Sequence, residues 1–73
     1  MTKPPLVSGQ QAVRALQRAG YRVIKQRGSH IKLHNPSTEI TLIIPNHREV
    51  DRWTLKNILR DAEIPAEDFV RLL

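Results

Sequence analysis

The fold of this chain is decided by the segment Gln26-Arg27-Gly28-Ser29-His30-Ile31-Lys32-Leu33-His34, in which a tight turn leads into an alternating strand. Gly28 can adopt the positive φ that such a turn requires. Successive side chains of a strand point to opposite faces, so Ile31 and Leu33 are predicted to face a core. The opposite, open face then carries His30, Lys32 and His34. Two imidazoles and an ammonium group on one face of a basic protein indicate contact with phosphates, although a hairpin face also carries polar residues simply because it is exposed.

Two further strands are predicted, because runs of strand-forming residues flank this segment on both sides. The first strand covers residues 21–27, and the second, residues 29–34, ends at the turn Asn35-Pro36-Ser37-Thr38. The third strand covers residues 39–44 and places its alternate apolar residues on one face. Connections this short imply an antiparallel meander with one face on the core and the other open to solvent.

Helices are predicted both before and after the three strands in the sequence. Ser8 and Gln11 form the pattern of a capping box, and the helix that they begin ends at Gly20. A second helix follows the capping residue Asp51 and continues to about residue 62, with apolar residues at helical spacing on its inner side. Its outer side carries a basic stripe formed by Arg52, Lys56 and Arg60.

The C-terminal segment completes the predicted fold. Ile64-Pro65 breaks the second helix, and residues 66–73 can form a short terminal helix. The chain is therefore predicted to be an α+β protein of order α-β-β-β-α, with helices on one face of a three-stranded antiparallel sheet. At 73 residues, with no repeat and no linker, it is expected to form a single domain over residues 1–73.

Charge is distributed unevenly along the chain, whose formal net charge is +5. Seven basic residues and no acidic one lie between Met1 and Thr38, whereas four acidic residues and one arginine lie from Asp61 onward. This polarised field favours a polyanion that approaches the N-terminal half. A membrane is the weaker partner, because no segment is apolar enough to span one and residues 1–6 do not resemble an export signal. The absence of cysteine fits a reducing cytoplasm.

The residue types present exclude several kinds of chemistry. The three glycines are isolated, so no glycine-rich loop can cradle a phosphate. His30 and His34 lie four residues apart on a strand, roughly 13 Å, which is too far to share one metal ion. Ser29 directly precedes His30, so their side chains point to opposite faces and cannot form a hydrolase pair. What remains is metal-free proton transfer by histidine, whose ordinary pKa of about 6.5 suits neutral pH.

RNA suits such chemistry, because its own 2′-hydroxyl supplies the nucleophile. The protein then has to supply proton transfer, positive charge and correct positioning. His30 is the candidate for proton transfer, with Lys32 or Arg27 stabilising the charge that develops on the phosphate. The alternative for His30 is a surface histidine packed beside a turn.

Three other residues carry weaker indications. His34 precedes a turn, where solvated polar residues are common. His47 follows Pro45 just ahead of the second helix, where it can cap that helix, contact a phosphate or assist proton transfer. Trp53, the only tryptophan, is more typical of a core lid or a partner contact than of a base-stacking platform.

Four motifs occur in order along the chain. They are Gly20-Tyr21 after the first helix, Gln26-Arg27-Gly28-Ser29-His30, Pro45-Asn46-His47, and Thr54-Leu55-Lys56-Asn57-Ile58-Leu59 in the second helix. Together, over nearly the whole chain, they resemble HicA-type toxins, the small mRNA interferases of bacterial toxin–antitoxin pairs. The resemblance implies a fold like that of double-stranded-RNA-binding domains, metal-independent mRNA cleavage without a cofactor, and neutralisation by a HicB-type antitoxin. The family's catalytic histidine corresponds to His30, whereas Trp53 stands where the family often has glycine.

The expected RNA-binding residues surround this histidine in sequence. They are Arg22, Lys25, Arg27, Ser29, Lys32 and His47. The alternative function is a non-catalytic RNA-binding module of the same fold, which recognises A-form shape and phosphates without cutting. A third, a small ribosome- or DNA-associated protein, rests on charge alone. Loss of His30 is expected to abolish cleavage in a nuclease and to leave binding intact in a non-catalytic module, which separates the first two functions.

Overall fold

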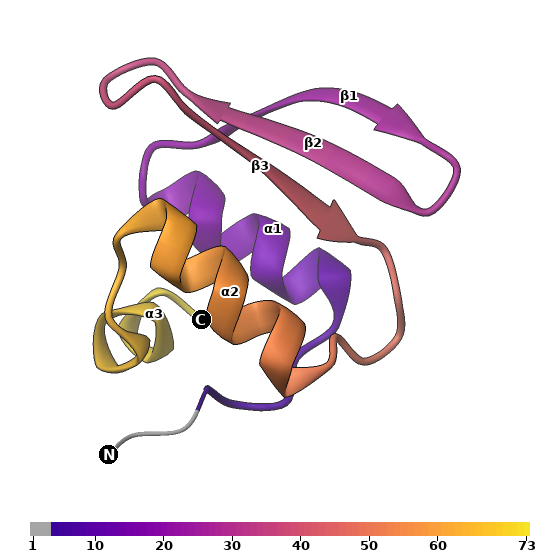
Figure 1. Ribbon diagram of the computed structural model, residues 1–73, viewed down its shortest axis with the longest axis vertical. Coiled ribbons are helices and arrows are strands. Elements are labelled where there is room, and N and C mark those ends of the chain that lie inside the picture. The colour runs from indigo at the N-terminus through magenta and orange to yellow at the C-terminus, as the bar shows by residue number, and fades with distance from the viewer. Residues whose placement is uncertain (1–3) are drawn as a thin grey trace.

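The computed structural model describes residues 4–73 and arranges them in two layers, a three-stranded sheet and a layer of helices (Figure 1). The elements, in chain order, are α1 (Gly9–Arg18), β1 (Arg22–Arg27), β2 (His30–Asn35), β3 (Ile40–Pro45), α2 (Arg52–Ala62) and α3 (Ala66–Leu72). This arrangement confirms the predicted α+β fold, and each predicted boundary lies within two residues of the observed one. Residues 1–3, which include the basic Lys3 and the start of the expected domain, lie outside the described residues.

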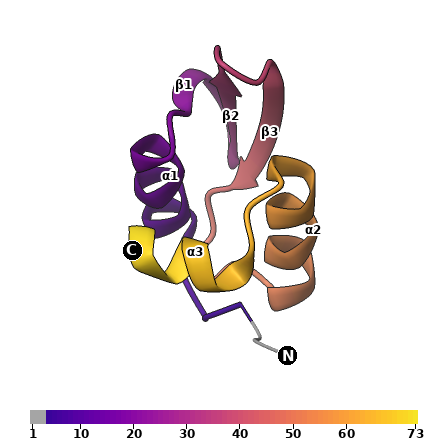
Figure 2. The same cartoon turned by 90° about the vertical axis from the view of Figure 1, so that its left-hand side faces the viewer.

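The sheet is an antiparallel meander with the strand order β1-β2-β3. β2 and β3 pair in continuous register, from His30 opposite Pro45 to Asn35 opposite Ile40. All three helices lie on one side of the sheet, and its other face is left open (Figures 1 and 2). β1 forms one edge, and all of its residues are exposed.

The two long helices begin at side-chain caps, as predicted. The Ser8 hydroxyl accepts a hydrogen bond from the Gln11 N–H at 3.1 Å, and the Gln11 amide oxygen accepts one from the Ser8 N–H at 2.8 Å. At α2 the Asp51 carboxylate accepts from the Thr54 N–H at 3.1 Å. These bonds satisfy backbone donors that a helix start otherwise leaves free. Within residues 4–73, no helix combines the length and apolar character needed to cross a membrane.

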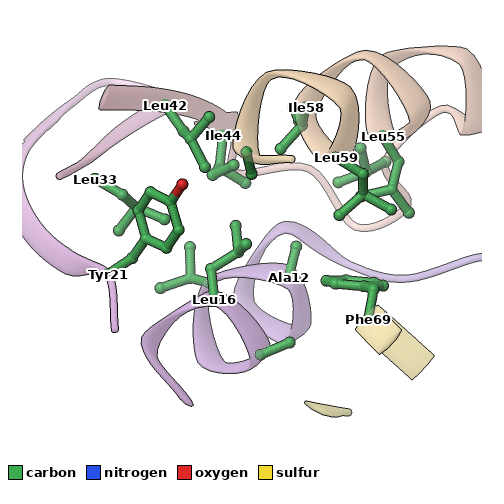
Figure 3. Close-up of a cluster of buried hydrophobic side chains, with 14 of the residues drawn as sticks. Ala12, Leu16, Tyr21, Leu33, Leu42, Ile44, Leu55, Ile58, Leu59 and Phe69 are labelled. Carbon is green, nitrogen blue, oxygen red and sulfur yellow. The ribbon is translucent and has the colours of Figure 1, made fainter. Parts of the chain in front are cut away.

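The core fills the space between the sheet and the helices (Figure 3). The sheet contributes the alternate residues Ile31, Leu33, Leu42 and Ile44, and the helices contribute, among others, Leu16, Leu55 and Leu59. Phe69 of α3 is also fully buried in this cluster. The Arg18 guanidinium further connects α1 to α3 by donating to the Leu72 carbonyl at 2.6 Å. The short terminal helix is therefore part of the core rather than an appendage.

Tyr21 is the one tyrosine and lies in this core with its hydroxyl inside the cluster (Figure 3). Within residues 4–73, that buried oxygen has no partner in hydrogen-bonding geometry. Burial raises the pKa of the Tyr21 phenol, an effect that the nearby Thr38 side chain offsets in part. The aromatic ring contributes to packing, whereas the hydroxyl lacks the partner that a buried polar group normally has.

Candidate functional site

The open face of the sheet presents three rows of side chains, each of which crosses all three strands. Cross-strand partners lie on the same face of a sheet. The rows are Arg27–His30–Pro45, Lys25–Lys32–Ile43 and Arg22–His34–Thr41. Neighbouring strands lie about 4.8 Å apart, and alternate residues of one strand about 7 Å apart. The first two rows therefore bring cations from β1 and β2 around His30.

A bulge in β1 places Arg22 on this face. Lys25 pairs with Lys32, and Arg22 pairs with His34, because the register shifts between Val23 and Lys25. Strict alternation would put Arg22 and Lys25 on opposite faces of the sheet, since they are three positions apart. The extra residue of the bulge brings Arg22 and Lys25 back to the same face of the sheet. Bulges commonly redirect side chains in this way next to functional sites. All three basic residues of β1 consequently share the open face with the histidines.

Side chains of the first two rows line an open hollow of about 400 Å³. It is lined by Lys25, Arg27, His30, Lys32 and Ile43. The His30 imidazole therefore lies among three formal positive charges, with one apolar side chain beside them. Such a surface attracts phosphate groups and stabilises negative charge that develops on them. This hollow is the candidate functional site.

The turn before His30 is held in place by the loop that follows β3. The Asn46 N–H donates to the Ser29 carbonyl at 2.6 Å, and the Asn46 side chain accepts from the Gln10 amide at 3.0 Å. The Gly9 N–H donates to the His47 carbonyl at 2.9 Å. The loop carrying His47 is thereby connected both to the start of α1 and to the turn that precedes His30.

Gly9 lets α1 approach this loop closely. A Cβ at that position would overlap the Pro45 carbonyl oxygen and would lie 2.8 Å from the Asn46 Cα. Real Cβ atoms essentially never approach so closely. Only glycine fits here without displacing the loop, so Gly9 is a determinant of where the loop lies.

His34 occupies the far row of the open face and is held by its neighbours. Its Nδ1 lies 3.1 Å from the Thr41 hydroxyl oxygen, and its Nε2 lies 3.6 Å from a Glu39 carboxylate oxygen. It is half-buried rather than fully solvated, and it does not line the hollow. His34 thus differs from His30, which is exposed and lines the hollow.

The structure brings together some of the residues predicted to form the site and leaves others at its margin. The hollow collects His30 with Lys25, Arg27 and Lys32. Outside its lining are Arg22 in the far row, Ser29 in the turn and His47 in the adjoining loop. Ile43 lines the hollow but was not among the predicted site residues; alternation with the buried Leu42 and Ile44 was the signal for its outward position.

Trp53 and the basic stripe lie on α2, in the helix layer and away from the open face (Figure 1). Trp53 is 67% exposed, so it is not a lid on the core. The Lys56 ammonium lies 5.7 Å from the centroid of its ring, within the range of a cation–π interaction. Its exposure excludes the core lid and is compatible with the other two roles considered for it, a partner contact and the less typical base-stacking platform.

The site shows no arrangement typical of a metal centre: within residues 4–73, no three side chains among His, Cys, Asp and Glu gather as a group of ligands.

A comparison with protein families matches residues 9–64 to the model of the HicA toxin of bacterial toxin–antitoxin systems. No curated protein matches the chain. The matched segment runs from the start of α1 to the residue before Pro65, and so it contains the whole sheet, the hollow and α2. Because this match covers well over half of the chain, the protein belongs to the HicA family of toxins from bacterial toxin–antitoxin systems.

Proposed function

We propose that this toxin is a metal-independent endoribonuclease, an mRNA interferase that cleaves mRNA in the cytoplasm with His30 as its catalytic residue. The observation that carries the proposal is the hollow, in which one exposed imidazole lies among the side chains of Lys25, Arg27 and Lys32. Family membership supports the toxin role, and the concentration of positive charge on one face supports a polyanionic substrate.

The proposed reaction uses groups that RNA itself brings. The 2′-oxygen attacks the adjacent phosphorus as its proton is removed, and the P–O5′ bond breaks as the 5′-oxygen gains a proton. His30 performs one of these two proton transfers. Arg27 and Lys32 stabilise the charge on the non-bridging oxygens, which is greatest in the transition state.

The residues around the hollow contact the RNA chain on either side of the cleaved bond. Lys25 and Arg22 lie on β1 and bind phosphates as cations, which makes affinity dependent on salt. Ser29 lies in the turn and His47 in the loop connected to it, and both contact the RNA at the other end of the hollow. These residues position the RNA, and His30 acts on it.

The cognate partner implied by membership of a toxin–antitoxin family is proposed to be a HicB-type antitoxin that covers the open face. An acidic surface would complement the cations of β1 and β2 and would speed the encounter. RNA and the antitoxin would then compete for one surface. A ternary complex in which RNA keeps its affinity would contradict neutralisation by occlusion.

The direct test is incubation of the purified protein with mRNA in EDTA. His30→Ala should lower the cleavage rate by at least about a hundredfold, the usual contribution of one positioned acid or base. His34→Ala is the matched control, because it removes the other imidazole of β2 without touching the hollow. Both variants need the thermal unfolding profile of the wild type, and an RNA with 2′-deoxyribose at the cleaved position should resist cutting.

The outcomes separate the candidate functions. Cleavage by the wild type and His34→Ala, but not by His30→Ala, supports the proposal. Equal cleavage by all three contradicts a catalytic role for His30. RNA binding without cleavage by any of them replaces the nuclease with the non-catalytic RNA-binding module, for which the cationic open face suffices.

A modified substrate identifies which proton transfer His30 performs. Replacing the 5′-oxygen of the cleaved bond by sulfur gives a leaving group that needs no proton. If His30 is the acid, His30→Ala should cleave this substrate nearly as fast as the wild type does. If His30 is the base, the substrate should leave the defect unchanged.

A further inference from the structure

Ile43 is an apolar residue at the centre of a cationic surface. It is 48% exposed, lies opposite Lys32 in the middle row and lines the hollow with the His30 imidazole. Binding a phosphate gains nothing from an isoleucine, since its side chain offers no donor and no charge. The proposed phosphate contacts therefore do not account for the exposed apolar side chain of Ile43.

Resting on the proposed function, we propose that Ile43 and the aliphatic stems of Lys25 and Lys32 form a platform against which a nucleobase of the RNA packs, next to the phosphate that His30 acts on. Lysine stems commonly cover apolar surface while their ammonium groups stay in water. The platform is the Lys25–Lys32–Ile43 row, and the adjacent row carries Arg27 and His30. This makes Ile43 a base-contacting residue that helps to hold a nucleotide at the site, whatever its base.

The phenylalanine, tyrosine and tryptophan side chains lie elsewhere, so the apolar surface at this site centres on Ile43. Proteins that bind single-stranded RNA usually stack its bases on aromatic rings or on arginine planes. Tyr21 and Phe69 are buried in the core and Trp53 lies on α2, while the His30 imidazole is reserved for the proposed proton transfer. The apolar surface of the hollow therefore comes from Ile43 and the stems beside it, with the Arg27 guanidinium as a neighbouring plane.

The dimensions fit one nucleotide that spans two rows. A base over the middle row leaves its phosphate about 7 Å along the strand direction, where the row of Arg27 and His30 lies. The volume of about 400 Å³ also falls within the range of roughly 300–1,000 Å³ that is usual for small-molecule sites. Base and phosphate thus occupy adjoining parts of the same hollow.

The test is a binding measurement in which nothing is cleaved. Two twelve-residue oligonucleotides with 2′-O-methyl groups throughout are compared by fluorescence anisotropy, one with its bases and one with every base removed. Ile43→Ala should weaken binding of the base-bearing strand by roughly five- to tenfold, as expected when about half of an isoleucine side chain loses its contact. It should leave binding of the abasic strand unchanged. Ile43→Thr keeps the β-branched shape that favours a strand, so it provides a second variant if Ile43→Ala is unstable.

Thr41→Ala is the matched control, because Thr41 lies two positions away on the same face of β3 and outside the hollow. It should not alter the ratio of the two affinities. The proposal is overturned if the Ile43 variants bind both strands like the wild type, or lose the same factor for both. A failure of the proposed nuclease activity would appear in the cleavage assay and not in this one.

Discussion

Replacement of Gly9 by alanine should weaken the fold at the point that positions the site. The alanine Cβ would overlap the Pro45 carbonyl oxygen and lie 2.8 Å from the Asn46 Cα, where ordinary contact begins at 3.4 Å. The loop has to withdraw from α1. In doing so it loses the 2.9 Å hydrogen bond from the Gly9 N–H to the His47 carbonyl and strains the bond from Asn46 to Ser29.

The expected loss of stability combines three contributions. Overpacking costs about 1–3 kcal/mol, and a lost backbone hydrogen bond costs about 1 kcal/mol. The better helix propensity of alanine returns less than about 1 kcal/mol at the first residue of a helix. The free energy of unfolding should therefore fall by about 2–3 kcal/mol, equivalent to roughly 10–20 °C in Tm for a chain of this size.

Urea and thermal unfolding of Gly9→Ala beside Gly28→Ala provide the measurement and its control. Gly28 has a φ of +58° and open space around its missing Cβ, so its alanine variant suffers backbone strain of about 1 kcal/mol without overlap. Gly9→Ala should be the more destabilised of the two. Equal stability, or a milder effect at Gly9, would refute the argument that close contact with the loop determines this residue.

Three further predictions concern the core and the helix ends. Burial raises the pKa of Tyr21, so the folded state resists ionisation of the phenol, and the free energy of unfolding should fall as pH rises above about 10. Tyr21→Phe should flatten this loss in urea unfolding measured from pH 8 to 11. Phe69→Ala should lower the free energy of unfolding by about 3–5 kcal/mol, measurable by calorimetry, whereas loss of a peripheral helix would cost far less. Glu63 ends α2 with a φ of +59°, so Glu63→Gly should raise stability by about 0.5–1 kcal/mol in urea unfolding; a decrease would contradict strain at this cap.

The features of the fold that the sequence predicted correctly depend on local chemistry. The Ser8 and Gln11 pair acts across a single helical turn, and the alternation in residues 30–34 needs only one buried face. The inward and outward residues of β2 are therefore as predicted, with His30 and Lys32 on the open face. Short turns then allow only a meander, so the layer arrangement follows from the same information.

Two of the three features that escaped prediction, the bulge in β1 and the role of Gly9, depend on contacts between distant segments. The bulge between Val23 and Lys25 exists only in the pairing of β1 with β2, and no glycine in β1 marks it. Gly9 resembles any glycine at a helix start until the loop after β3 lies against it. Ile43 was hidden in the apolar run Leu42-Ile43-Ile44-Pro45, although its neighbours on both sides face the core. Each of these features positions a residue at the candidate site or beside it.

The uneven distribution of charge along the sequence gives the two layers of the fold different charge patterns. The basic residues of β1 and β2 share the open face, where Glu39 approaches only the far row, at His34. The acidic residues after position 60 lie on α2, at its C-terminal end or on α3, on the helix side of the sheet (Figure 1). An approaching polyanion is thus attracted to the cationic face of the sheet, whereas the helix layer mixes these carboxylates with the basic stripe of α2. Under the proposed function, the same field would orient an acidic antitoxin, so RNA and antitoxin would compete for one face, and the bulge in β1 that adds Arg22 to this face would strengthen the attraction for both.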